Sequence, residues 1–301
     1  MTIEEVVARV PAFSGADVTV SALGGGITNL NYKVDVGGES FVVRIPGKDS
    51  ERLGIDRRRE YACTVAASRT GVAPEVTYFL EAEGILITRF IAGRPVSAEE
   101  LGRPDGIRRV AASLQRVHGG PAFPATFSAF QTVQDYLAVA RGAAPLPADI
   151  GWMVDRAAAI DRALGGGAVR PCHNDLLQAN FIDDGRSLRI LDWEYAAMGD
   201  PFFDLGNFAV HHGFSDVQET WLLEAYRGQA TAADRARVKL MKILSDLREA
   251  MWAMVQVAIS TLEYDFAAYG RTHFQRYVTQ LQDPRLPTWM REAGVETSAQ
   301  R

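Results

Sequence analysis

The most informative stretch of the sequence is residues 172–206, which read CHNDLLQANFIDDGRSLRILDWEYAAMGDPFFDLG. Asn180 follows Asp175 by five residues, and a short apolar strand pattern leads directly into Asp192. The Asp-Asp-Gly segment at 183–185 is typical of a tight turn, since aspartate and glycine favour the backbone conformations that turns require. A hairpin reverses the chain, so the sequence predicts that Asp192 lies beside Asn180.

The residue types in this stretch suit phosphoryl transfer. That reaction needs a carboxylate that orients the attacking hydroxyl, together with oxygen ligands for Mg²⁺. Mg²⁺ keeps several waters, so one carboxylate and one amide oxygen are sufficient protein ligands. The pattern therefore predicts three catalytic residues: Asp175 as the base, with Asn180 and Asp192 as the metal ligands. The structural alternative, a polar loop before a buried strand, accounts for each residue singly but not for the whole set.

The pattern H-N-D-x4-N, a turn, a strand and D-W-E-Y resembles the catalytic core of the choline/ethanolamine kinase family. That family is part of the wider aminoglycoside-phosphotransferase group, whose fold is similar to that of protein kinases. Here Asp192 is followed by Trp193-Glu194-Tyr195, as in the small-molecule kinases, where protein kinases have Phe-Gly. The resemblance covers about residues 20–282.

The resemblance implies an α+β, protein-kinase-like fold with two lobes. Residues 1–92 would form the small, nucleotide-binding lobe with an antiparallel sheet, and residues 93–301 the larger, mainly helical lobe that carries the catalytic and substrate-binding groups. A hinge at about 88–95 would join them. Helical spacing of apolar residues over 105–118, 129–141, 148–164 and 233–263 agrees with a helical second lobe.

The composition fits a globular protein and narrows the class of partners. The chain has 301 residues, 47% of them hydrophobic and 23% charged, which is enough to bury a substantial core. A net charge of −5 argues against nucleic acid and favours a neutral or cationic small substrate. The two cysteines, Cys63 and Cys172, imply no disulfide framework. The N-terminal residues lack a signal-peptide pattern and no apolar stretch reaches membrane length, so we expect a cytoplasmic protein without stable membrane insertion; a homodimer is compatible with the sequence.

A glycine-rich loop lies between two strand patterns, 18–22 and 31–36. Backbone N–H groups can approach phosphates where no Cβ intervenes, so this loop is predicted to cover the phosphates of ATP. Three glycines also occur in ordinary hairpins, which is the structural alternative. The nucleotide-binding residues predicted here are Gly24, Gly25, Gly26 and Asn29.

Arg44 lies in the strand pattern 41–45, where it could also be a simple edge arginine. The resemblance implies that it holds the α- and β-phosphates, because the family has arginine where protein kinases have lysine. Its expected ion-pair partner is Glu60, on a helix that runs to about Ser68, whereas Arg57–Arg59 are expected to lie mostly at the surface. The resemblance also implies that the hinge meets adenine, through Thr88, Phe90 and Ile91.

The acceptor site is expected on one face of the long helix 233–263. Choline kinases typically have two tryptophans three residues apart there, which hold a quaternary ammonium through cation–π attraction. Trp252 matches the second tryptophan, but Glu249 stands in place of the first, which favours an amine with N–H donors. Glu194 and Tyr195 are further substrate contacts in this interpretation. The alternative is that Glu249 pairs with a neighbouring base such as Lys242 or Arg248 at the surface.

Three other polar residues are expected to be structural. His118 should be a helix-end residue, His173 should hydrogen-bond the loop or the turn at Asp192, and Asp204 should tie the loop to the following helix.

These observations favour ATP- and Mg²⁺-dependent phosphorylation of the hydroxyl of a small cationic alcohol, with choline or ethanolamine first. Kinases for an aminoglycoside, thiamine or a sugar are alternatives, because fold alone does not fix the acceptor. A nucleotide-binding pseudokinase that acts as a regulator is the alternative from another class.

Overall fold

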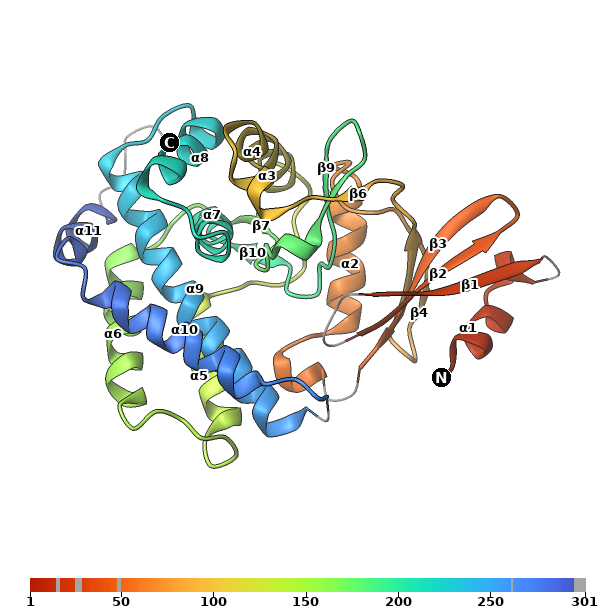
Figure 1. Cartoon of the computed structure of the whole chain (residues 1–301), viewed down its shortest axis with the longest axis horizontal. Coiled ribbons are helices and arrows are strands. Elements are labelled where there is room, and N and C mark those ends of the chain that lie inside the picture. The colour runs from red at the N-terminus through yellow and green to blue at the C-terminus, as the bar shows by residue number, and fades with distance from the viewer. Residues whose placement is uncertain (15–16, 25–28, 48–49, 261, 295–301) are drawn as a thin grey trace.

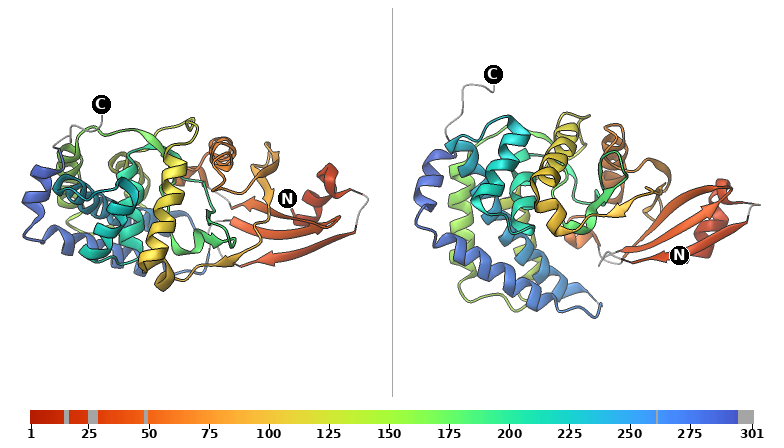
Figure 2. Two further views of the ribbon diagram at one scale, coloured as in Figure 1. Left: turned by 90° about the horizontal axis from the view of Figure 1, so that it is seen from above. Right: turned by 45° about the horizontal axis from the view of Figure 1, so that its top comes forward.

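The computed structural model describes residues 1–14, 17–24, 29–47, 50–260 and 262–294. Gly25 and Gly26, two of the predicted loop glycines, lie outside the described residues. The sheet that follows the N-terminus lies at one end of the long axis, and the helices form the other end (Figures 1 and 2). Within the described residues, no helix has both the length and the apolar character that crossing a membrane requires.

The N-terminal part is a five-stranded antiparallel sheet with the order β1-β2-β3-β5-β4. Its helix α1 begins with a capping box, in which Thr2 and Glu5 satisfy each other's backbone N–H groups. Apolar residues of α1 and of the sheet form a separate small core around Val34, Val43 and Ile87. The elements are α1 Ile3–Arg9, β1 Val18–Leu23, β2 Asn29–Val36, β3 Glu39–Pro46, α2 Arg57–Ser68, β4 Val76–Leu80 and β5 Ile85–Arg89.

Helix α2 packs differently from α1. Its buried residues Cys63, Ala66 and Ala67 belong to the large core of the helical part rather than to the small core of the sheet. In Figure 1, α2 lies between the sheet and the helices. This position allows α2 to present charged side chains to both parts.

The second part is mainly helical, as predicted. Its helices are α3 Ala98–Gly102, α4 Pro104–His118, α5 Ala129–Ala140, α6 Ile150–Leu164, α7 Pro201–His211, α8 Asp216–Arg227, α9 Ala232–Ile259, α10 Phe266–Leu281 and α11 Leu286–Glu292. Short strands are β6 Arg94–Pro95, β7 Arg170–Cys172, β8 Phe181–Asp183, β9 Leu188–Ile190 and β10 Ala197–Gly199. The α+β architecture is therefore confirmed, while four helices, α3, α8, α10 and α11, were not predicted from the sequence.

Helix α9 is the centre of the helical part. It packs against α5, α7 and α10, and most of its length is buried on every side (Figure 1). A helix that is buried all round, rather than on one stripe, has to find internal partners for its charged residues. Asp246, Arg248 and Glu249 are all fully buried, so each needs such a partner.

The predicted hairpin is formed by β8 and β9. Phe181 pairs with Ile190, and the turn contains Gly185 with φ +83°, a left-handed conformation that glycine adopts without steric cost. Beyond the last strand pair, Leu191 N donates to Asn180 O at 2.9 Å. The hairpin thus brings Asp192 next to Asn180, which confirms the expectation from the turn.

The close packing of α7 against α9 at Gly206 can be tested. A Cβ on Gly206 of α7 would lie 2.7 Å from Met241 Cβ and 2.9 Å from Lys242 N on α9. We expect Gly206→Ala to lower the free energy of unfolding by about 1–3 kcal/mol, because overpacking outweighs the gain in helix propensity. Gly151→Ala in α6 is the matched control, since nothing lies within 4 Å of its added Cβ. Urea unfolding in which Gly206→Ala is as stable as Gly151→Ala would contradict this packing.

Candidate active site

The loop that contains the H-N-D-x4-N pattern is held by the first turns of α7. Asp204 accepts hydrogen bonds from the backbone N–H groups of His173 at 2.8 Å and Asn174 at 2.7 Å. Asn207 accepts from the backbone N–H of Leu176 at 2.6 Å. Asn174 has φ +66°, a sparsely populated conformation for a residue other than glycine, so the loop shape depends on these anchors.

Asp204 has a further partner in His118, the last residue of α4. The two side chains are buried and lie 2.9 Å apart, and the other ring nitrogen of His118 is 2.6 Å from the Tyr226 hydroxyl. Burial opposes ionisation, but His118 and the loop N–H groups hold the pKa of Asp204 below its usual range. His118 is a structural residue at a helix end, as expected, although its buried partners were not predicted.

Cys172 lies close to this pair, and the three possible ligand atoms of His118, Cys172 and Asp204 lie within 4.8 Å of one another. Burial raises the pKa of the Cys172 thiol well above its usual value, and the thiol donates to the backbone carbonyl of Arg170 at 3.4 Å. Asp204 is already occupied by three hydrogen bonds. The cluster is therefore a structural hydrogen-bonded site rather than a metal site.

His173 supports the loop from inside. Its Nε2 lies 2.8 Å from Leu191 O, and its Nδ1 accepts the backbone N–H of Asp175 at 3.2 Å. The ring packs edge-on against Trp193 with centroids 4.6 Å apart. Burial lowers the pKa of His173, which favours the neutral ring. These contacts agree with the structural role expected for this histidine.

The loop and the hairpin bring Asp175, Asn180 and Asp192 together. Asn180 Nδ2 donates to the backbone carbonyl of Asp175 at 2.9 Å, so its Oδ1 is the atom left for other ligands. Asp192 has φ +64°, a second strained position, and its carboxylate is partly exposed. Burial raises the pKa of Asp175 to about 8, with Arg248 opposing the rise and Glu249 and Asp192 adding to it. A pKa near neutrality suits a group that has to accept a proton.

The predicted pair between Arg44 of β3 and Glu60 of α2 is present. The same guanidinium also donates to Asp192 Oδ1 at 2.5 Å. The sheet, α2 and the turn after β9 are therefore joined at one arginine. The pairing is confirmed by these contacts, whereas its role in nucleotide binding stays a prediction.

Arg57 does not lie where the sequence predicted. It was expected at the surface, but its side chain is largely buried and donates to Glu60 Oε2 at 2.7 Å and Glu194 Oε2 at 3.0 Å. It also donates to Asn29 Oδ1 at 3.0 Å, and Asn29 Nδ2 donates to Glu194 Oε2 at 3.1 Å. The three-residue spacing between Arg57 and Glu60 was the signal that could have identified this residue. Glu194 thus faces the sheet, and burial raises its pKa.

On α9, the predicted acceptor residues make contacts within the protein. Glu249 accepts from Arg248 Nη1 at 2.5 Å and from the Tyr269 hydroxyl at 3.1 Å. Trp252 Nε1 donates to the Tyr195 hydroxyl at 3.0 Å. The alternative pairing of Glu249 with Arg248 is therefore present, but in the interior rather than at the surface.

Arg248 is a second buried arginine beside the predicted site residues that the sequence did not place there. Its side chain is 1% exposed, donates to Asp175 Oδ1 at 3.3 Å and lies over the Tyr195 ring at 4.5 Å from the centroid. Although burial opposes ionisation, Arg248 and the nearby His211 hold the pKa of Glu249 below its usual range. The adjacent charges of Arg248 and Glu249 within a long apolar helix pattern were the available signal, because charges that become buried require partners.

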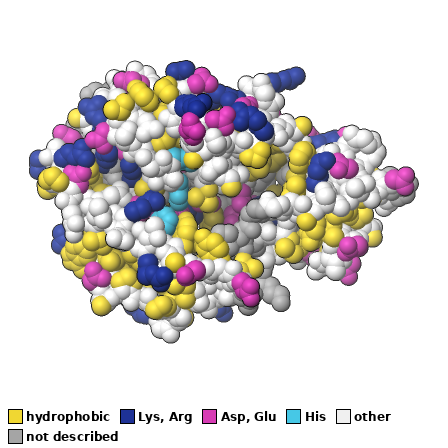
Figure 3. Space-filling view, viewed as in Figure 1, with side chains coloured by type: hydrophobic (Ala, Val, Ile, Leu, Met, Phe, Trp, Pro, Cys, Tyr) yellow, Lys and Arg dark blue, Asp and Glu magenta, His cyan; other side chains and the backbone are white. Residues whose placement is uncertain are grey.

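The predicted hinge begins in the last residues of β5 and continues beyond it. Thr88 pairs with Val42 of β3, and Phe90 N donates to Ser40 O at 2.9 Å. Lys33 Nζ lies 5.0 Å from the Phe90 ring centroid, and Ile91 is half-buried. Gly24 precedes β2 and is described, unlike Gly25 and Gly26. On the face seen in Figure 3, the molecule is hollowed between the sheet and the helices, with acidic side chains visible inside.

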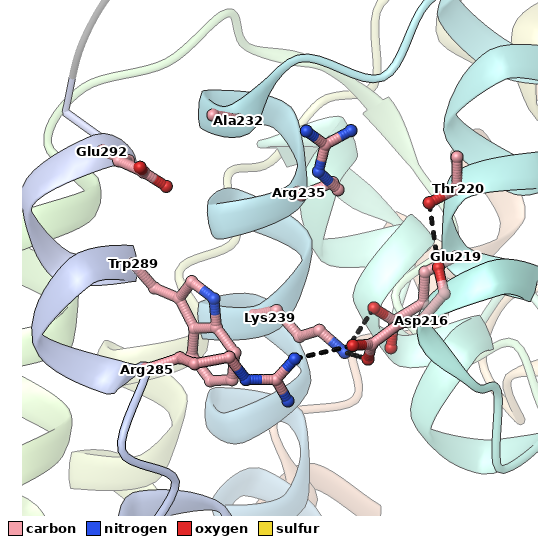
Figure 4. A pocket seen from close by; sticks show the side chains of 9 residues that line it. All are labelled: Asp216, Glu219, Thr220, Ala232, Arg235, Lys239, Arg285, Trp289 and Glu292. Atoms are coloured by element: carbon pink, nitrogen blue, oxygen red, sulfur yellow. Dashed lines mark hydrogen bonds and ion pairs between the residues drawn. The ribbon is translucent and has the colours of Figure 1, made fainter.

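A cavity of about 320 Å³ lies elsewhere, between α8, α9 and α11 (Figure 4). Its charges pair with one another, as in the contacts of Lys239 and Arg285 with Asp216. None of the predicted site residues is among those that line it. It is therefore a charged surface cavity separate from the residues described above.

The comparisons with known proteins agree with this geometry. The family described as "Phosphotransferase enzyme family" matches residues 19–241. A crystal structure of a choline/ethanolamine kinase family protein from Mesorhizobium loti is 33% identical, has a TM-score of 0.84, and the match covers 98% of this chain and 99% of that one. A probable ethanolamine kinase A from Dictyostelium discoideum is 27% identical over 87% of this chain and 85% of its own. The choline kinase LicA from Streptococcus pneumoniae, 23% identical with a TM-score of 0.79 over 93% of this chain and 98% of that one, has the same fold.

The chain belongs to the phosphotransferase enzyme family and, within it, to the choline/ethanolamine kinase family. The predicted protein-kinase-like fold is confirmed, and the protein is a small-molecule kinase.

The loop anchor is tested by Asp204→Asn. This variant keeps the shape of the side chain but removes the charge to which the two backbone N–H groups and His118 hydrogen-bond. We expect a loss of about 3 kcal/mol or more in the free energy of unfolding near neutral pH. Because the folded pKa lies below the ordinary value of 3.8, the stabilisation is present above that pH and is lost as the pH falls through the folded pKa.

The measurement is urea unfolding of both proteins from pH 7 downward. The difference between them should shrink below about pH 4. A difference that stays constant, or that grows on acidification, would contradict the assignment of Asp204 as an ionised anchor.

Proposed function

We propose that this protein transfers the γ-phosphoryl group of ATP to the hydroxyl of a small amino alcohol, with choline and ethanolamine as the first acceptors to test. The observation that carries the proposal is the meeting of Asp175, Asn180 and Asp192 at one loop and hairpin, with Arg44 reaching Asp192 from the sheet. The relatives named above are described as choline or ethanolamine kinases, which supports the acceptor class. Kinases that act on aminoglycosides, thiamine or sugars are alternatives with the same fold, but no observation in this structure favours one of those acceptors.

In this proposal Asp175 orients the acceptor hydroxyl and takes its proton. The hydroxyl oxygen forms a bond to the γ-phosphorus as the bond from that phosphorus to the bridging oxygen breaks, and ADP leaves with the electron pair. The proton ends on the Asp175 carboxyl. Positioning and charge stabilisation supply most of the catalysis, since the transition state needs little covalent chemistry from the protein.

The residues fit a magnesium site. Asn180 has its amide nitrogen committed to a backbone carbonyl, which leaves its oxygen as a ligand, and Asp192 supplies a partly exposed carboxylate. These are the hard oxygen donors that Mg²⁺ prefers. A bound Mg²⁺ would supply positive charge that neutralises the phosphate oxygens. The strained backbone at Asp192 is consistent with a side chain held for such a function.

We assign the nucleotide to residues 1–92. Arg44, fixed by Glu60, would hold the α- and β-phosphates, and the loop with Gly24, Gly25, Gly26 and Asn29 would cover them. Adenine would meet Thr88, Phe90 and Ile91 at the hinge. Arg57 would act as a positioning residue, because it connects Glu60 with Glu194. The acceptor would lie on the other side of Asp175, near Tyr195, Glu249 and Trp252.

Prediction for the catalytic carboxylates. Asp175→Asn and Asp192→Asn should each lower kcat by about a hundredfold or more while the protein remains folded. Asp184→Asn is the matched control, since Asp184 lies in the same hairpin and, among the described residues, bonds to its own turn and Arg189. Turnover is measured by coupled ADP release with the acceptor present. Wild-type kcat in either of the first two variants would refute the assignment.

Prediction for Arg44. Arg44→Ala should raise the KM for ATP strongly, and Arg44→Lys should restore only part of it, because lysine cannot make a bidentate contact. Arg58→Ala is the control, as Arg58 is an exposed arginine near the start of α2 that pairs with Glu81. The measurement is the KM for ATP of each variant, from steady-state kinetics at varied ATP concentration. Unchanged ATP kinetics in Arg44→Ala would assign Arg44 to the structure of the sheet alone.

A further inference from the structure

The acceptor side of the site already contains a cation that belongs to the protein. Arg248 is fully buried in α9, and its Nη1 donates to Asp175 Oδ1 at 3.3 Å and to Glu249 Oε1 at 2.5 Å. Its guanidinium carbon lies 4.5 Å from the centroid of the Tyr195 ring. The guanidinium is therefore paired with two carboxylates and stacked on an aromatic face at the same time.

These are the groups that a quaternary ammonium needs. A trimethylammonium has no N–H bonds, so it is held by aromatic faces and by the charge of a nearby carboxylate. The Tyr195 face is covered by Arg248, and the Glu249 charge is shared by Arg248, the Tyr269 hydroxyl at 3.1 Å and His211 at 3.7 Å. Trp252 is also engaged, since Phe266 and Tyr269 lie against it edge-on at 5.8 Å.

Arg248 is held firmly in this position. Moving it away would leave the buried carboxylates of Asp175 and Glu249 without their closest cation, which is costly in a low-dielectric interior. Its Nε and Nη2 have no hydrogen-bond partner among the described residues, so the two carboxylates engage only part of the guanidinium. An incoming trimethylammonium therefore meets the positive charge of Arg248 at the aromatic face that it needs.

We propose that Arg248 is a specificity-determining residue of the acceptor site: its guanidinium occupies the Tyr195 face and the Glu249 charge, so that the site selects against a trimethylammonium and for an acceptor whose amine keeps its N–H bonds. An N–H donor can still bind a carboxylate in this site, because each carboxylate has about four lone-pair directions and Arg248 uses only part of them. A primary ammonium is also smaller than a trimethylammonium, and it does not require the Tyr195 ring. This inference rests on the proposed transfer to a small amino alcohol.

The test removes the internal cation. Arg248→Gln uncovers the Tyr195 ring and leaves Glu249 in place, so choline should gain on ethanolamine by about tenfold in the ratio of their kcat/KM values. Glu249→Gln should give no such gain, because Arg248 still covers the ring. Arg276→Gln is the matched control: it removes another arginine between α10 and α9, one that pairs with Asp246.

A second measurement does not depend on turnover. Tetramethylammonium binding, followed by calorimetry, should be weak in the wild type and about tenfold tighter in Arg248→Gln. If Arg248→Gln fails to fold because two buried carboxylates lose their partner, the double variant Arg248→Gln, Glu249→Gln removes one of those charges as well and still uncovers the ring. It should bind tetramethylammonium more tightly than Glu249→Gln does.

The outcomes separate the two proposals. A wild type that phosphorylates neither choline nor ethanolamine overturns the proposed function, while the binding of tetramethylammonium still tests the role of Arg248. The role of Arg248 alone is overturned if the wild type is active and Arg248→Gln changes neither the ratio of kcat/KM for choline and ethanolamine nor the affinity for tetramethylammonium. Tight binding of tetramethylammonium by the wild type overturns it as well.

Discussion

The structure depends on a shared ion-pair network between the sheet and the helical part. Arg44 and Arg57 contact three carboxylates, Glu60, Asp192 and Glu194, which come from α2 and from the segment after β9. Buried charges of this kind are tolerated only when every one of them has a partner, so the network fixes the position of Asp192 relative to β3. The sheet, the helix α2 and the hairpin of β8 and β9 therefore keep their relative positions through charge rather than through apolar packing alone.

The same constraint acts on the other side of Asp175, where α9 is buried all round. Arg248 and Glu249 neutralise each other there, and Arg248 also reaches the carboxylate of Asp175. Asp175 thus lies between two groups of fixed charges, one that faces the predicted nucleotide site and one that faces the predicted acceptor site. The backbone of its loop is held independently by Asp204 and Asn207 of α7.

Local sequence patterns predicted the parts of this arrangement that are themselves local. The turn at Gly185 predicted the hairpin, and Arg44 with Glu60 was predicted as a pair from the family resemblance. Arg57 was misplaced because Glu194 is 137 residues away in the sequence, a contact that no local pattern contains. Arg248 was only weighed as a surface partner, since the burial of its part of α9 on every side follows from the packing of α5, α7 and α10 around it.

The central claim is that this arrangement phosphorylates a small amino alcohol at its hydroxyl. The most direct measurement is ³¹P NMR of the purified protein with ATP, Mg²⁺ and one acceptor at a time, chosen from ethanolamine, choline, thiamine and an amino sugar. The account predicts a phosphomonoester of ethanolamine or choline, formed in step with ADP. A phosphomonoester formed only from thiamine or the amino sugar, or ATP left unchanged with every acceptor, would contradict it.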